Sequence, residues 1–463
     1  MKNRVVRNAR ILLKTVFILT IAAIYATIFF SYPEMSNVGV VVTNMTIIIY
    51  ATYRSFFSLR YNFSIYQFFY IFSLLFMGLA PLVQYKQSVQ TVGGYNIADN
   101  TYILTNIVML AVFVLIDFIY QHKHKRLAKK STDTKEQVGS LARRFNIKDN
   151  LKLRMLLLGL SLVSLVYAFF INQNDLTGLF YRDIFIDRVE IEDNMTMILA
   201  GILRPLSIFA FIFYYKIGKS KLFKITLFIL ALVTCFPLAL TRFLIGAYWI
   251  PVVITVYSSI SKNKILGYLY TLGLLILFPI FEVFRALSIY LERGTLAGAF
   301  FEKVSDAFSS MAYDSYQSLA FVIQNNFVTL GQQLTGVLGL FIPRSLWPDK
   351  PIGSGFTISE QYNLDWDNIS MNFFGEGYVN FGFIGVVLFA VLLAIAMRYL
   401  DHRYWTRVAK NGLLFPVVYL IILGIFAYIM RGDMIGSFTS TIGVIISATL
   451  VYFAIRIAKR VQG

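Results

Sequence analysis

The chain has 463 residues, of which 57% are hydrophobic and only 14% are charged, and its formal net charge is +18. Soluble domains carry about 25% charged residues and have too little interior to bury so large an apolar fraction, so the composition excludes an ordinary soluble protein and indicates one dissolved in the bilayer. The positive charge is explained by basic cytoplasmic loops that fix the topology, and it does not indicate binding to nucleic acid.

Apolar stretches of about 20 residues, the length needed to cross the hydrocarbon core, recur along the chain. They predict an all-α, polytopic membrane protein with about twelve spans: 11–31, 38–56, 64–84, 101–120, 152–171, 196–215, 225–241, 244–261, 265–286, 376–398, 413–430 and 437–456. No small-residue cleavage site follows the first apolar run, so we expect an uncleaved span there rather than a signal peptide.

Lysine and arginine are concentrated in every second loop. These loops include the N-terminal segment, the polar connector 121–150, the cluster around Lys219 and the segment after Arg403. Short basic loops stay in the cytoplasm, so the distribution predicts that both termini are cytoplasmic.

One long segment, 287–375, separates the ninth and tenth predicted spans on the opposite, external side. Apolar residues at helical spacing predict an amphipathic helix over 295–324. Three prolines within Pro343–Pro351 then exclude regular helix. Long loops of this composition usually carry function, so we expect an external functional region here.

External arginines are a second feature, because the external side is otherwise poor in basic residues. They are Arg182, Arg188, Arg242, Arg285, Arg293, Arg344 and Arg431, with Arg204 deeper in a span. Arginine holds phosphate through paired hydrogen bonds, so a diphosphate at the outer surface is a natural ligand. The alternative is that each arginine pairs with a nearby acid or a lipid headgroup, as Arg285 could with Glu282.

Histidine is missing from the predicted external side, because His122, His124 and His402 all fall in cytoplasmic loops. A proton removed outside must therefore go to a carboxylate or to phosphate. The candidate carboxylates are Asp314, Glu360, Asp365, Asp367, Glu376 and Asp433. No external cluster has metal-ligand spacing and there is no glycine-rich nucleotide loop, so we expect neither a metal nor another cofactor.

Three sequence blocks indicate a family. They are the arginine turn Leu240–Gly246, the segment Pro343–Pro351, and the stretch from Asn372 to Gly385 that enters a helix. With about a dozen spans and a large external loop late in the chain, the sequence resembles the bacterial O-antigen and capsule repeat-unit polymerases of the Wzy type. In general architecture it is also similar to GT-C glycosyltransferases.

The resemblance implies a glycosyltransferase that polymerises polyprenyl-diphosphate-linked oligosaccharide repeat units by inverting transfer. The reaction would take place on the outer leaflet of the cytoplasmic (inner) membrane. Besides these lipid-linked glycans and the bilayer, a chain-length regulator and a flippase are the partners to expect.

Site residues follow from the same resemblance. Residues expected to grip the diphosphate are Arg204, Arg242, Arg285, Arg344 and Arg431. Glu376 or Asp314 would deprotonate or orient the acceptor hydroxyl. Trp347, Trp366 and Tyr378 would stack on sugar rings, although ordinary packing explains each of these aromatics equally well.

Three other functions remain open from the sequence. A flippase of lipid-linked oligosaccharides also has about twelve spans, but such transporters are usually built of repeated halves with short loops. An O-antigen ligase-like transferase would be expected to carry an external histidine. A structural or receptor protein without catalysis is the third alternative.

Overall fold

The computed structural model describes residues 37–121, 149–182, 194–261, 264–366, 369–406 and 412–460. The predicted span 11–31 and most of the connector 121–150 lie outside the described residues, as do Arg188 and Asp367. Within the described ranges all regular structure is helical, which confirms the predicted all-α class.

Ten helical runs in the described parts of the chain are long and apolar enough to cross a membrane, so the protein is a multi-pass membrane protein. They are Val38–Phe57 (α2, Val38–Thr52, and η1), Ile65–Lys86 (α3, Ile65–Phe72, η2, and α4, Ala80–Lys86), Asp99–Gln121 (α5), Leu151–Ile171 (α7), Met195–Ile217 (α8, Asn194–Leu203, and α9, Leu206–Ile217), Lys221–Ala239 (α10, Lys221–Thr234, and η6), Ile265–Val283 (α12, Ile265–Leu272, η7, and α13, Phe278–Val283), Phe373–Thr406 (α19), Leu414–Arg431 (α20) and Met434–Lys459 (within α21, Met434–Arg460). The eighth predicted span corresponds to the shorter apolar helix α11, Arg242–Val256.

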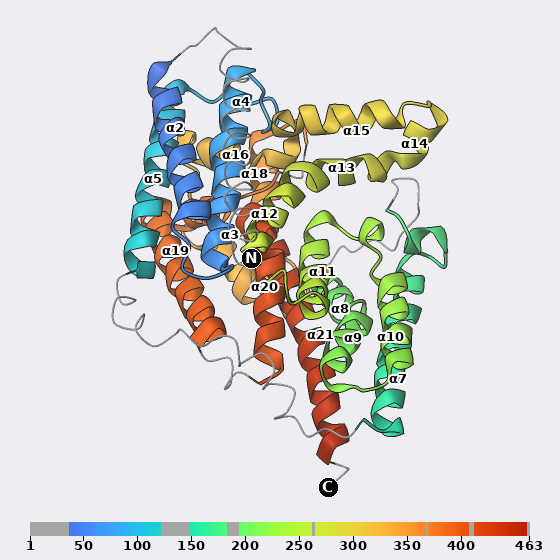
Figure 1. Cartoon of the computed structure of the whole chain (residues 1–463). Helices are drawn as coiled ribbons and strands as arrows, with labels where there is room; N and C mark the ends of the chain where they lie inside the picture. The colour runs from blue at the N-terminus through green and yellow to red at the C-terminus, as the bar shows by residue number, and fades with distance from the viewer. Residues whose placement is uncertain are drawn as a thin grey trace, which may run out of the picture.

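The buried side chains form two clusters that meet along α20. One cluster is built from α2, α3, α5, α16 and α19, and the other from α7, α9, α10, α11 and α21. Helix α20 contributes Leu420 and Leu423 to the first and Val417 and Ile421 to the second. Figure 1 shows α20 standing between the two groups of helices.

The run Ile65–Lys86 is the innermost span, because its most apolar window is completely buried. Its first backbone amides, those of Ile65 and Tyr66, donate to the carboxylate of Asp401 over 2.9 and 3.3 Å. Tyr120 and Tyr419 donate their hydroxyls to the same carboxylate over 2.8 and 2.6 Å. The start of α3 is therefore satisfied inside the protein, as a helix end removed from water requires.

Two glycines bring α11 and α20 into backbone contact. A Cβ added to Gly246 would lie 2.2 Å from the carbonyl oxygen of Gly424, and one added to Gly424 would lie 2.0 Å from that of Gly246. Only glycine permits this approach, which is typical of small residues at membrane helix interfaces.

The predicted span 376–398 begins differently in the structure. Helix α19 is interrupted at Phe381 and Gly382, where Gly382 has a φ of 62°, and the backbones of Gly377 and Gly385 then touch. Glu376 therefore lies on a short helical segment before the kink, and the straight membrane helix starts after it. Glycine makes this turn possible because it adopts a positive φ without steric cost.

The segment 287–375 lies at one end of the bundle, and its part from Ala307 onward packs on that end. It contains α14 (Leu287–Glu292), α15 (Leu296–Ser305), α16 (Ser315–Gln324), α17 (Gln332–Leu338) and α18 (Ser354–Tyr362). Gln84, near the end of α4, donates to the carbonyl of Tyr313 over 3.1 Å. The single amphipathic helix predicted over 295–324 is wrong: two 3-10 turns separate α15 from α16, and residues 315–323 of α16 are all buried.

Candidate functional site

Five arginines from five separate segments gather at the end of the bundle on which the segment 287–375 packs. Arg182 follows a short 3-10 turn, Arg204 joins α8 to α9, and Arg242 begins α11. Arg285 lies in the 3-10 turn η8 (Phe284–Ala286) after α13, and Arg431 ends α20. Four of the five come from the predicted diphosphate-binding set, and Arg182 is an addition.

Arg182 is close enough to Arg285 and to Arg204 for its charge to interact with theirs. Burial lowers the pKa of Arg182, and the positive charges of Arg285 and Arg204 lower it further. The end of α10 and the turn that follows it fix two of them. Arg204 Nε donates to the carbonyl of Thr234 over 3.1 Å, and the Arg182 amide donates to that of Leu238 over 2.9 Å.

Arg242 lies between acidic and aromatic partners. Its Nη1 donates to the carbonyl of Phe278 over 3.2 Å, and its guanidinium stacks over the Phe278 ring at 4.3 Å from the centroid. Glu282 lies 3.6 Å from the same nitrogen, and the charges of Arg431 and Arg285 act on Arg242 as well. These contacts hold the guanidinium of Arg242 in place, near the positive charges of Arg431 and Arg285.

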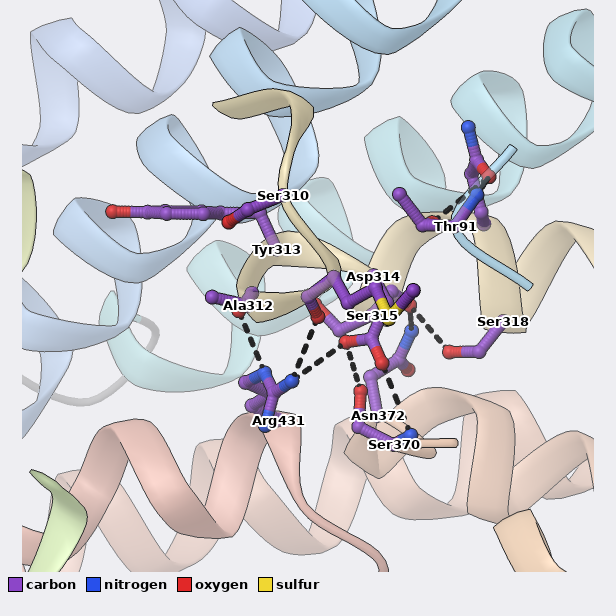
Figure 2. Close-up of polar contacts among 12 residues, drawn as sticks. Thr91, Ser310, Ala312, Tyr313, Asp314, Ser315, Ser318, Ser370, Asn372 and Arg431 are labelled. Carbon is purple, nitrogen blue, oxygen red and sulfur yellow. Dashed lines mark hydrogen bonds and ion pairs between the residues drawn. The ribbon is translucent and has the colours of Figure 1, made fainter. Parts of the chain in front are cut away.

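Arg431 fastens the segment 287–375 to the end of α20 (Figure 2). It donates to the carbonyls of Ala312 and Met311 over 2.8 and 3.0 Å, and it forms an ion pair of 3.0 Å with Asp314. Asp314 also accepts hydrogen bonds from the backbone amide of Ser370, over 3.1 Å, and from its hydroxyl. With its oxygens engaged in this way, Asp314 is better placed to hold the segment than to remove a proton.

Glu376, the other predicted base, is buried next to a half-buried carboxyl, that of Asp433. It is 2% exposed, and its carboxylate accepts from the Ser354 hydroxyl over 2.8 Å and from the Met434 amide over 2.9 Å. Asp433 lies close enough for the two negative charges to repel each other. Burial raises the pKa of Asp433. A carboxyl with a raised pKa is a suitable proton acceptor near neutral pH.

Arg344 stands apart from the other arginines. Its Nη1 donates to the carbonyl of Lys350 over 3.0 Å, within its own loop. No interaction among the described residues links it to the five gathered arginines. The buried Lys350 in turn donates to the carbonyls of Leu340 and Ile342 over 3.3 and 2.9 Å. Arg344 and Lys350 therefore hold the proline-containing loop in shape.

The predicted sugar-stacking aromatics are engaged in packing. Trp347 lies against Gly339, where an added Cβ would meet its ring at 2.7 Å. Trp366 is partly buried against the first core cluster. Tyr378 is 3% exposed and stacks edge-on with Phe383, with 5.1 Å between ring centroids. Of the three, Trp347 and Trp366 keep an accessible surface that a ligand could contact.

Sequence reasoning placed Arg182 outside but left it out of the diphosphate-binding set. It lies in no distinctive motif, and only the fold brings it to Arg204 and Arg285. Lys303, which forms an ion pair of 2.9 Å with Glu282, was omitted for the same reason. Among the described residues, no three His, Cys, Asp or Glu side chains are grouped so that they could hold a metal ion.

The fold defines the class of the protein as a multi-pass, all-helical membrane protein with a capped, arginine-rich end. Comparison with protein-family models, with curated proteins and with solved structures finds no match to this chain.

Proposed function

We propose that this protein is a glycosyltransferase that acts on polyprenyl-diphosphate-linked oligosaccharides and polymerises their repeat units. The observation that carries the proposal is the convergence of Arg182, Arg204, Arg242 and Arg285 at one end of a membrane bundle. Gathering like charges costs free energy, so such a group is expected where it offsets an anionic ligand.

The chemistry of the transfer explains why guanidinium groups are needed. The acceptor hydroxyl oxygen attacks the anomeric carbon of the donor sugar, and the bond from that carbon to the diphosphate breaks. Negative charge grows on the departing lipid diphosphate, and fixed arginines stabilise that charge in the transition state. The proton of the acceptor hydroxyl passes to the carboxyl pair Glu376 and Asp433. Holding two lipid-linked substrates side by side removes much of the entropic barrier.

The proposed orientation places the arginine-rich end at the outer surface of the cytoplasmic membrane and both termini in the cytoplasm. The distribution of charge supports it, because Lys216, Lys219, Lys221 and Lys224 lie between α9 and α10 or near their ends, away from the arginines. Short basic loops of this kind stay in the cytoplasm.

The test is reconstitution of the purified full-length chain in vesicles with a synthetic polyprenyl-diphosphate-linked oligosaccharide. A ladder of products, each longer by one repeat unit and accompanied by release of polyprenyl diphosphate, is the expected result. Transport of the substrate across the bilayer without elongation would instead identify a flippase, and transfer of the glycan to a different lipid acceptor would identify a ligase-like enzyme.

A genetic test complements the biochemical one. Deletion of the gene in the organism that carries it should leave single repeat units on the cell surface, because export precedes polymerisation in this scheme. Full-length surface polysaccharide in the deletion strain would overturn the proposal.

A further inference from the structure

We propose that α13, η8, α14 and α15, here called the helical arm, lie in the membrane surface as an interfacial anchor whose partner is the lipid bilayer. The inference is independent of the proposed enzymatic function, because it rests on the shape and exposure of the arm alone.

The helical arm is a hairpin that leaves the bundle sideways. Figure 1 shows α13, α14 and α15 extending away from the bundle, crosswise to the long axes of α20 and α21. The hairpin is closed by Lys303 and Glu282, 2.9 Å apart, and by the rings of Phe284 and Phe300, with 5.6 Å between their centroids. Gly294, with a φ of 63°, makes the turn at its tip. The arm is thus an ordered element rather than a loose loop.

The outer part of the arm is apolar but is not covered by protein. No described residue of α14 is buried, and Ala299 is the one buried residue in α15. Leu291 is 59% exposed and Phe301 is 81% exposed. A Cβ added to Gly294 or Gly298 would meet nothing within 4 Å. An unsupported apolar helix of this kind needs an apolar environment, because exposed apolar surface is costly in water.

The continuity of the arm with an apolar helical run of the bundle indicates that lipid covers its exposed apolar surface. The arm begins within the apolar helical run Ile265–Val283: the first part of this run, α12, contributes Leu266 to the first core cluster of the bundle, and the last part, α13, is the base of the arm. The base of the arm therefore lies where that run leaves the bundle at the membrane surface. From there, a hairpin running crosswise to the spans follows the plane of the bilayer, which is the position of interfacial amphipathic helices.

The side chains of α15 agree with an interfacial position. Consecutive residues on a helix point about 100° apart. Phe301 and Glu302 are both exposed, and this angle lets one of them face lipid while the other faces water. The charged residues of the arm balance: Glu282, Glu292 and Glu302 are opposed by Arg285, Arg293 and Lys303. Binding should therefore depend on apolar burial and need no anionic lipid.

The experiment compares labels at two neighbouring positions in the full-length protein. Phe301→Cys and Glu302→Cys are each labelled with a thiol-reactive fluorophore and reconstituted in phosphatidylcholine vesicles. The wild-type chain controls for background labelling, because its single cysteine, Cys235, is buried. Quenching is measured with acyl-chain-brominated lipid and with aqueous iodide.

We expect brominated lipid to quench the label at Phe301→Cys several times more strongly than the label at Glu302→Cys, and iodide to show the reverse order. Iodide quenching of both labels without lipid quenching would place the arm in water and overturn the proposal. Equal lipid quenching at both positions would also overturn it, because the arm would then be submerged. Protection of the labels from both quenchers, with disulfide-linked dimers of the unlabelled Phe301→Cys variant under oxidising conditions, would mean that a second copy covers the face instead.

Discussion

Glu282 lies between Arg242 and Lys303: one of its carboxylate oxygens is 3.6 Å from Arg242 Nη1 and the other is 2.9 Å from Lys303 Nζ. One arginine of the proposed diphosphate site therefore already has an anionic partner. A diphosphate would have to compete with this carboxylate for the guanidinium.

Glu282→Gln should consequently strengthen substrate binding. Removing one partly exposed competing charge is worth about 1 kcal/mol or less, which lowers KM for the lipid-linked donor by up to about fivefold. The measurement is the KM of the reconstituted protein. Glu292→Gln, at the exposed tip of the helical arm, is the matched control and should leave KM unchanged. A higher KM for Glu282→Gln would mean that the carboxylate positions Arg242 instead of competing for it.

Arg242→Ala and Arg285→Ala should each reduce the rate of polymerisation by about 100-fold or more, the usual cost of removing one donor to a developing anion. Lysine at either position should restore only part of the rate, because an ammonium group lacks the paired donors of arginine. Chain elongation in vesicles is the measurement. Arg293→Ala provides the control, because Arg293 is exposed near the tip of the helical arm. Wild-type rates for both site variants would remove these arginines from the reaction.

Asp314→Asn should destabilise the fold rather than alter the chemistry. Asp314 and Arg431 have side chains only 4% and 14% exposed, and breaking a buried ion pair costs about 3–5 kcal/mol. The expected result is a lower Tm in detergent. The exposed Asp306→Asn should melt like the wild type. An unchanged Tm together with loss of elongation would show that Asp314 takes part in the reaction.

Gly424→Ala should disrupt the contact between α11 and α20. The new methyl group would lie 2.0 Å from the Gly246 carbonyl oxygen, and overpacking of this kind typically costs about 1–3 kcal/mol. The Tm should fall and the detergent-solubilised protein should aggregate. Gly273→Ala is the control, because an added Cβ there meets nothing within 4 Å. If both variants melt alike, the two helices do not cross at these glycines.

The raised pKa of Asp433 predicts how the stability of the protein depends on pH. Because its pKa is raised in the folded protein, the folded chain keeps this proton to a higher pH than the unfolded chain does. As the pH rises from about 4, the ordinary range of an aspartate, through the raised pKa, the folded state acquires a partly buried charge and loses stability.

Asp433→Asn removes that loss and preserves the cap that Asp433 provides to the Gly436 amide at the start of α21. The variant should therefore gain Tm relative to the wild type as the pH rises. The exposed Asp349→Asn should show no such trend. A constant difference in Tm between wild type and Asp433→Asn across this range would contradict the assignment.

Most of the membrane spans could be predicted from the sequence, because the thickness of the hydrocarbon sets the length of each apolar run. The errors occur where tertiary contacts override that rule. Glycine at position 382 allows α19 to kink, so Glu376 falls before the membrane helix. Helix α16 looks amphipathic in the sequence but is buried on all sides, since helical periodicity does not reveal that a neighbour covers the polar face.

The candidate site was predictable only in part. The alternation of spans puts Arg204, Arg242, Arg285 and Arg431 at one end of the bundle, but it does not say which of them are neighbours. Arg344 lies in the most distinctive sequence block and yet contacts its own loop. Arg182 lies in no distinctive sequence block, and a backbone hydrogen bond to Leu238 brings it to the other arginines of the site.

The carboxylate of Asp401 has a consequence for biosynthesis. The amide of Ile65 and its acceptor are separated by 336 positions in the chain. During translation, α3 enters the membrane long before the ribosome has made the group that satisfies its first amides. The most central helix of the protein can therefore reach its final state only after α19 has been inserted. Nascent chains that end before Asp401 lack the acceptor for these first amides.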